Sequence, residues 1–123
     1  MSKLTTNIWR KEVACKCGCG FNTADYETVV AVQDACDYFA KMLKVDKVVA
    51  RINSWCRCVK HNKDEKGKPN SWHLKGRALD FSIDNVTAAA LYDYLDKKYK
   101  GKYCVGLYDN RVHFDTREIE YRY

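Results

Sequence analysis

The sequence contains no long run of uncharged apolar residues. Its apolar runs are only a few residues long, whereas a membrane-spanning helix needs about 20 such residues. The segment from Met1 to Lys11 also lacks the apolar core of a secretory signal peptide. We therefore expect synthesis in the cytoplasm without a signal peptide, and no insertion into a membrane.

The chain is also too short for two ordinary domains and too apolar for a disordered protein. A length of 123 residues favours one domain with one core. Hydrophobic residues make up 46% of the chain and aromatic residues 13%, which is enough for such a core. We expect residues 1–123 to form a single domain and the protein to be a monomer.

No motif of a nucleic-acid-binding module is present in the sequence. The net charge is +6, from 22 Lys and Arg against 16 Asp and Glu, and it favours anionic partners in general. Nucleic acid, anionic lipid and bacterial wall polymers all qualify. The basic residues are spread along the chain rather than gathered in one stripe, which argues against nucleic acid.

Hydrophobic periodicity predicts two helices. Apolar residues recur every three or four positions over about residues 25–43, which is typical of an amphipathic helix. A second helix is expected to be capped by Asp84 or Asn85, to continue through about Tyr99 and to end at Gly101.

Strands are expected over residues 47–54 and 77–83, where β-branched and apolar residues alternate with polar ones. Residues 103–108 and 111–116 are expected to form a hairpin around Asp109-Asn110. The polar stretch from Arg57 to Trp72 predicts a long loop of the kind that frames a site. Together these elements predict an α+β fold with a mainly antiparallel sheet and flanking helices.

Two histidines and one aspartate are candidates for a metal site. His73 lies at the end of the long loop, Asp80 in the next strand and His113 in the last strand. Strand alternation places Asp80, and His113 with Asp115, on faces opposite their apolar neighbours. Two imidazoles and a carboxylate are a ligand set that holds catalytic zinc and leaves one position open. Each residue alone is more often an ordinary surface residue, but the combination favours a site.

Seven cysteines are present, an odd number that leaves at least one unpaired within a monomer. Cys15-Lys16-Cys17-Gly18-Cys19 and Cys56-Arg57-Cys58 have C-x-C spacings, which together could supply a second, sulfur-rich zinc site. The spacing lacks the two-residue gap of the usual zinc knuckle. Buried small side chains with some incidental thiols are therefore the alternative interpretation.

The sequence resembles peptidase family M15, the D-alanyl-D-alanine carboxypeptidase-like zinc peptidases, and above all its small phage-type members. The residues that carry the resemblance are Ser71-x-His73-x-x-Gly76-x-Ala78-x-Asp80, then Gly106-Leu107-Tyr108, then Val112-His113-Phe114-Asp115-Thr116-Arg117. Arg57-Cys58-x-x-His61-Asn62 and the opening Cys-Lys-Cys-Gly-Cys-Gly match as well. The resemblance extends from about Cys15 to Arg117 and implies a Hedgehog/DD-peptidase-like fold.

The resemblance implies a zinc peptidase that hydrolyses D,D or L,D bonds in peptidoglycan stem peptides. It assigns the zinc ligands to His73, Asp80 and His113, and the binding of the substrate carboxylate to Arg57, whose planar fork suits that group. A chain without a signal peptide would reach the wall only after release. We therefore expect a phage endolysin or a virion-associated lysin that acts on the bacterial cell wall.

The catalytic base does not follow from the resemblance. Hydrolysis at zinc needs a carboxylate that accepts the proton of the attacking water. Many members of the family carry Asp or Glu three residues before the last histidine, where this chain has Asn110. Asp109 is the first candidate and Asp115 the second, although Asp115 could instead orient His113 or Arg57.

Asp64 and Glu65 on the long loop are weaker candidates for the base. Two other classes of function remain open. The chain could be a catalytically silent zinc-binding module that binds wall peptide or a protein partner. It could also be a cysteine-rich zinc module for nucleic acid, if the C-x-C pairs hold the metal.

Overall fold

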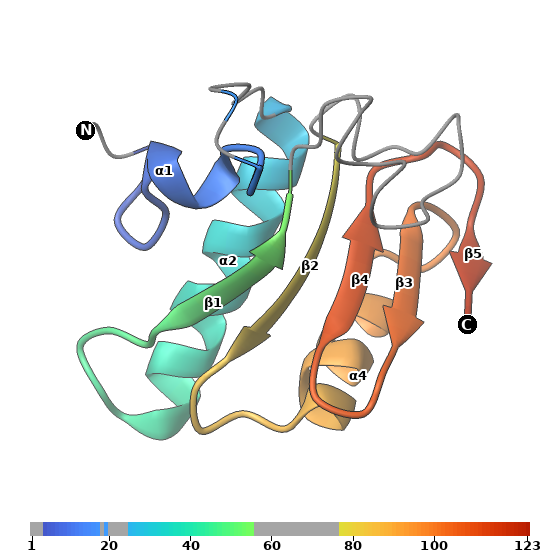
Figure 1. The fold of residues 1–123 in the computed structure, drawn as a ribbon. Helices are drawn as coiled ribbons and strands as arrows, with labels where there is room; N and C mark the ends of the chain where they lie inside the picture. Colours follow the sequence, from blue (N-terminus) through green and yellow to red (C-terminus); the bar gives the residue numbers. More distant parts are fainter. Residues whose placement is uncertain (1–3, 18, 20–24, 56–76) are drawn as a thin grey trace.

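A computed structural model describes residues 4–17, 19, 25–55 and 77–123 of the chain. In these ranges two longer helices, α2 and α4, cover one face of a five-stranded sheet (Figure 1). The predicted α+β class with a mainly antiparallel sheet and flanking helices is confirmed. The elements in chain order are α1 (Arg10–Val13), α2 (Tyr26–Leu43), β1 (Ala50–Ser54), β2 (Ala78–Ile83), α4 (Ala88–Lys98), β3 (Cys104–Leu107), β4 (Val112–Asp115) and β5 (Tyr121–Arg122).

The strand order in the sheet is β1-β2-β4-β3-β5. β1 with β2, β2 with β4 and β3 with β4 pair antiparallel, and the pairing of β3 with β4 is the hairpin that the sequence predicts. β5, which was not predicted from the sequence, pairs parallel to β3 at the edge of the sheet. Its two residues are too few for a periodic pattern, so only the pairing identifies it as a strand.

Helix α2 matches the predicted helix closely and begins one residue later, at Tyr26. Asp25 is its N-cap, and Lys44 ends it in the left-handed conformation with φ of 57°. The side chains buried along one face include Val29, Val32 and Phe39. This apolar face packs on the sheet and supplies much of the core.

Helix α4 begins later than predicted, because Thr87 is its N-cap rather than Asp84 or Asn85. The Thr87 side chain accepts a hydrogen bond of 3.1 Å from the Ala90 backbone N–H. Asp84 instead pairs with Arg51 of β1 at 2.6 Å. Asn85 occupies the turn that follows β2, with a φ of 67°.

Alternation along β2 and β4 separates an apolar face from a polar one, as predicted. Leu79, Phe81, Val112 and Phe114 are fully buried and point to the helices. The residues between them therefore point to the other face of the sheet, which α2 and α4 leave open. The candidate site lies on this second face.

The described part of the N-terminal segment packs beside β1 and supplies none of the five strands. Ile8 and Val13 are fully buried in the core, and the Asn7 side chain donates a hydrogen bond of 2.7 Å to the Val48 carbonyl. Its one helix, α1, has four residues. Among the helices that the structure describes, none is both long enough and apolar enough to span a bilayer.

Candidate metal centre

Asp80 and His113 are direct partners in the antiparallel pairing of β2 with β4. Their side chains lie on the polar face, where they retain 15% and 12% of their exposure. The Asp80 Oδ1 atom lies 2.9 Å from His113 Nδ1. Two of the three predicted zinc ligands are therefore in contact, although 33 residues separate them in the chain.

Arg77 fixes the register that brings these two residues together. Its guanidinium donates hydrogen bonds of 2.6 Å to the Thr116 carbonyl and 3.1 Å to the Thr116 hydroxyl. The Thr116 hydroxyl also lies 3.3 Å from that of Thr28 in α2. The start of β2 and the end of β4 are thus joined to each other and to the helix behind them.

His113 lies between two carboxylates. Its Nε2 atom is 2.8 Å from Asp115 Oδ2, while Nδ1 faces Asp80. Burial lowers the pKa of His113, but the hydrogen bonds to Asp115, Asp80 and Cys104 outweigh burial and raise that pKa to about 11. In the absence of a metal the ring is therefore an imidazolium at neutral pH, with a donor at each nitrogen.

Asp115 is fully buried and is held in place by Arg117. The Arg117 Nε and Nη2 atoms donate to the two carboxylate oxygens, each at 2.7 Å, and the Arg117 backbone N–H donates at 3.2 Å. Burial raises the pKa of Asp115, but hydrogen bonds from His113 and Arg117 lower it to about 2. Asp115 is therefore a fixed anion that orients the His113 ring.

The neighbouring strand β3 completes this face of the site. Cys104 lies opposite Asp115 and Gly106 lies opposite His113 in the register of β3 with β4. Tyr123 lies against Gly106, where a side chain on residue 106 would clash with its ring. The Tyr123 and His113 rings are 6.0 Å apart between centroids. Tyr123 thus covers one side of the cluster.

Of the remaining candidate residues, the structure describes Asp109 alone. Asp109, the first candidate for the base, is exposed in the turn between β3 and β4, next to Asn110. The predicted ligand His73 and the predicted carboxylate-binding residue Arg57 lie outside the described residues, as do Asp64 and Glu65. The roles predicted for His73, Arg57 and Asp109 remain predictions.

The chemistry of Asp80 and His113 fits a zinc ion. Their 2.9 Å separation is close to the roughly 3.3 Å between a nitrogen and an oxygen ligand on tetrahedral zinc. With Nδ1 directed to the metal, Asp115 would be the outer carboxylate that fixes a ligating imidazole.

Cys104, His113 and Asp115 form a second group whose ligand atoms lie within 4.8 Å of one another. Asp115 is the weaker ligand here, because its two oxygens already accept hydrogen bonds from the Arg117 cation. Cys104 and Asp115 are also fully buried, whereas Asp80 and His113 keep 15% and 12% of their side-chain exposure. We therefore favour Asp80 with His113.

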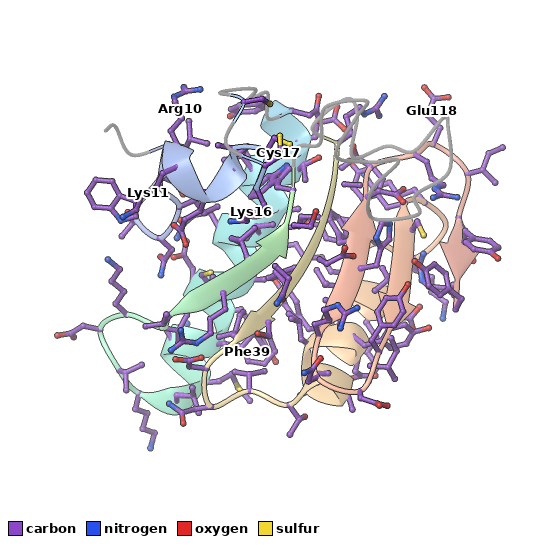
Figure 2. The ribbon with its side chains drawn as sticks, in the orientation of Figure 1. Arg10, Lys11, Lys16, Cys17, Phe39 and Glu118 are labelled. Carbon is purple, nitrogen blue, oxygen red and sulfur yellow. The ribbon has the colours of Figure 1, made fainter. Side chains whose placement is uncertain are left out.

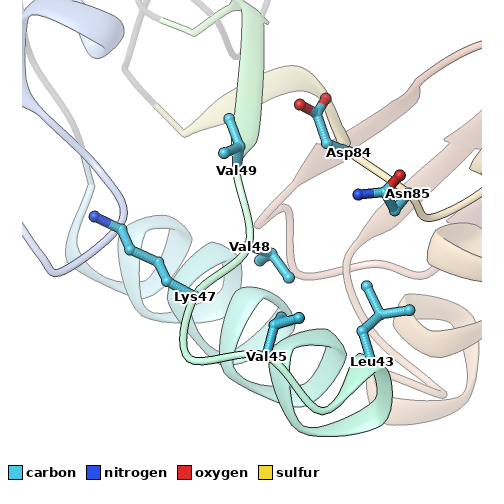
Figure 3. A pocket seen from close by; sticks show the side chains of 7 residues that line it. All are labelled: Leu43, Val45, Lys47, Val48, Val49, Asp84 and Asn85. Carbon is cyan, nitrogen blue, oxygen red and sulfur yellow. The ribbon is translucent and has the colours of Figure 1, made fainter.

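A separate cavity of about 320 Å³ lies where α2 ends and β1 begins (Figure 3). It is lined by Leu43, Val45, Lys47, Val48, Val49, Asp84 and Asn85. Its one carboxylate, Asp84, is paired with Arg51. The cavity contains none of the candidate ligands and does not contribute to the metal centre.

His113 lies between the carboxylates of Asp80 and Asp115 on the face of the sheet opposite α2 and α4, an arrangement of donors that could hold a metal ion. The sequence model of the family Peptidase M15 matches residues 6–115. The chain therefore belongs to the Peptidase M15 family, as its motifs predict, and is a peptidase. Searches among curated proteins and among solved structures returned no match.

Four further residues contribute to the site but were not assigned to it from the sequence: Cys104, Gly106, Arg117 and Tyr123. The alternation of the predicted hairpin would have placed Cys104 and Gly106 on the face of Asp115 and His113. Arg117 is part of the motif Val112-His113-Phe114-Asp115-Thr116-Arg117, without an evident role there. No local pattern indicates Tyr123, because its position depends on β5.

Proposed function

We propose that this chain is a zinc-dependent peptidase that hydrolyses stem peptides of bacterial peptidoglycan at D,D or L,D bonds. The zinc ligands in this proposal are His73, Asp80 and His113. One observation carries it: Asp80 and His113 meet at 2.9 Å on the open face of the sheet in a member of Peptidase M15. Peptidases of this family are typically zinc-dependent, and the donor set suits that ion.

Each residue of the site would have a separate role in the hydrolysis. Asp115, fixed by Arg117, holds the His113 ring and keeps one nitrogen directed to Asp80. Zinc, when bound, supplies Lewis acidity at the scissile carbonyl and lowers the pKa of water. Asp109 would accept the proton of the attacking water and return it to the leaving amine. Arg57 would bind the carboxylate of the substrate.

The biological role that we propose is that of a phage-type lysin acting on the cell wall after release. The net charge of +6 would favour association with anionic wall polymers. Such association should weaken as salt is raised, because exposed charges are screened beyond about 8 Å at physiological ionic strength. Nucleic acid is not part of the proposal.

Digestion of purified peptidoglycan, followed by mass spectrometry of the released peptides, tests this function and identifies the bond that is cut. The zinc-loaded protein should release stem peptides, while Asp80→Ala and His113→Ala should lose both activity and the zinc bound at this site. Asp93→Ala is the matched control, because Asp93 is an exposed carboxylate on α4. Its zinc content and activity should be unchanged.

A catalytically silent zinc-binding module that binds wall peptide or a protein partner is the second candidate. Asn110 favours it, because many members of the family have an acidic residue at that position. A zinc-loaded sample that cleaves no peptidoglycan of several wall chemotypes but still binds it would support the silent module. Cleavage would exclude it.

A further inference from the structure

We propose that Cys15, Cys17 and Cys19 supply three of the four ligands of a structural zinc ion. The three sulfur atoms lie within 4.8 Å of one another, and the Cys15 and Cys17 sulfurs are 3.4 Å apart. This site is formed by residues other than the Asp80–His113 cluster. It does not depend on the proposed peptidase function.

The spacing of the sulfurs suits a metal better than a disulfide. Two thiolates on a tetrahedral zinc, each with a bond of about 2.3 Å, lie about 3.8 Å apart. A disulfide bond brings two sulfurs to about 2.0 Å. The observed 3.4 Å between Cys15 and Cys17 lies near the first value. Thiolate sulfur is also the ligand type that selects zinc over magnesium or calcium.

The burial of the three cysteines places such an ion at the boundary of the core. Cys15 is 3% exposed, whereas Cys17 and Cys19 are exposed. One ligand would therefore reach the ion from the protein interior and two from the surface. An ion in this position would fix the exposed Cys17 and Cys19 side chains to the buried Cys15.

The segment that carries the cysteines has little regular secondary structure among its described residues. Among the described residues before α2, the one helix is α1, with four residues, and no strand is present. Its contacts with the core are made by side chains such as Ile8 and Val13. A metal bound to three residues within five positions would fix this irregular backbone, as structural zinc sites do in small domains.

The surroundings of the cysteines are basic. Arg10, Lys11 and Lys16 lie on the same side of the molecule as Cys17 (Figure 2). The Lys16 ammonium donates to the Glu12 carbonyl at 3.4 Å, next to the turn that carries the thiols. Three thiolates around a divalent cation leave a net negative charge, which these cations would stabilise.

Zinc content and X-ray absorption at the zinc edge, measured on the full chain purified under reducing conditions, test the site. The wild-type spectrum should contain sulfur neighbours at about 2.3 Å. Cys17→Ser and Cys19→Ser should each lose one equivalent of zinc and these neighbours. Both residues are exposed, so neither substitution by itself disturbs the core. The loss is counted relative to the wild type, so it is visible whether or not the Asp80–His113 cluster holds zinc.

Cys36→Ala is the matched control. Cys36 is buried in α2, and burial raises the pKa of its thiol to about 12, so it is not expected to ligate zinc. This variant should retain all of the sulfur-bound zinc. Loss of that zinc in Cys36→Ala but not in Cys17→Ser would contradict the proposal.

If the variants do not fold, a measurement on the wild type alone still tests the proposed site. Alkylation followed by peptide mapping should find Cys17 and Cys19 protected in the zinc-loaded protein and labelled after chelation. Equal labelling with and without chelator would overturn the proposal. So would a wild-type absorption spectrum without sulfur neighbours, or a Cys15–Cys17 disulfide in the reduced preparation.

Discussion

Asp80 Oδ1 and His113 Nδ1 lie 2.9 Å apart, on directly opposed residues of β2 and β4. The same imidazole contacts Asp115 through its other nitrogen, at 2.8 Å. His113 is therefore fixed at both nitrogens, one by a candidate zinc ligand and the other by a buried anion. The predictions for the site follow from this arrangement.

Asp115→Asn should reduce zinc affinity about 10- to 100-fold, because the ligating ring loses the carboxylate that orients it. The Arg117 side chain is 31% exposed and can turn to solvent, so the variant should still fold. Affinity can be measured by competition with a chromophoric chelator. Glu118→Gln, which removes an exposed charge nearby, is the control and should bind zinc as the wild type does. Equal affinities for the two variants would remove Asp115 from the metal site.

Asp109→Asn should keep its zinc and lose turnover about 10²- to 10⁴-fold, if Asp109 is the general base. The side chain is exposed in a turn, so its loss should leave zinc content and thermal stability unchanged. Turnover is measured on peptidoglycan fragments, with Asp93→Asn as the control. Unchanged turnover would exclude Asp109 from the mechanism.

Zinc binding should weaken as pH falls. His113 has a pKa of about 11 in the metal-free protein, and a ligating imidazole must lose its proton. Below that pKa each zinc ion displaces one proton from His113, so affinity should fall about tenfold per pH unit. Chelator competition between about pH 6 and about pH 8 measures this slope. A flat profile would show that His113 is not a ligand.

The free energy of unfolding of the metal-free protein should decrease as pH rises, because of the same His113 pKa. The His113 pKa is raised from 6.5 to about 11 on folding. The imidazolium therefore contributes stability that is fully present below pH 6.5 and is lost as pH rises toward 11. Thermal melting of the metal-free wild type should show this decline, and His113→Gln should not.

Gly106→Ala should move Tyr123 away from His113, because the added methyl group would overlap the Tyr123 ring. Tyr123 is 45% exposed, so the ring can turn aside. The cost in stability should thus be smaller than the roughly 1–3 kcal/mol of overpacking a closed core. A changed chemical shift of the His113 ring, reproduced by Tyr123→Ala, is the expected result. An unchanged shift in both variants would contradict the predicted contact.

Thr87→Ala should lower the free energy of unfolding by about 1 kcal/mol, because the Ala90 N–H loses its acceptor. Thr87→Ser keeps the hydroxyl and should cost much less. If Asn85 were the N-cap, Asn85→Ala rather than Thr87→Ala would remove the capping hydrogen bond. The positive φ of residue 85 adds a separate cost in stability to Asn85→Ala. Denaturant unfolding of Thr87→Ala and Thr87→Ser distinguishes the cap from a mere loss of side-chain volume.

Much of the fold could be predicted because its determinants are local. The period of three to four in α2 and the alternation in β2 and β4 each depend on neighbours within one element. The N-cap of α4 was misplaced because the side chains of Asp84, Asn85 and Thr87 could each accept the hydrogen bond. The Asp84 carboxylate does not cap the helix because it accepts a hydrogen bond from Arg51, which is 33 positions away in the sequence.

The sequence by itself determined which side chains share a face, and hence that Asp80, His113 and Asp115 point away from the core. It could do so because the direction of a side chain along a strand is set by the strand alone. Only the tertiary structure decided that Asp80 lies opposite His113, that Arg117 takes both oxygens of Asp115, and that Tyr123 covers Gly106. Strand register and the parallel pairing of β5 depend on contacts between distant segments, and no local pattern encodes those contacts.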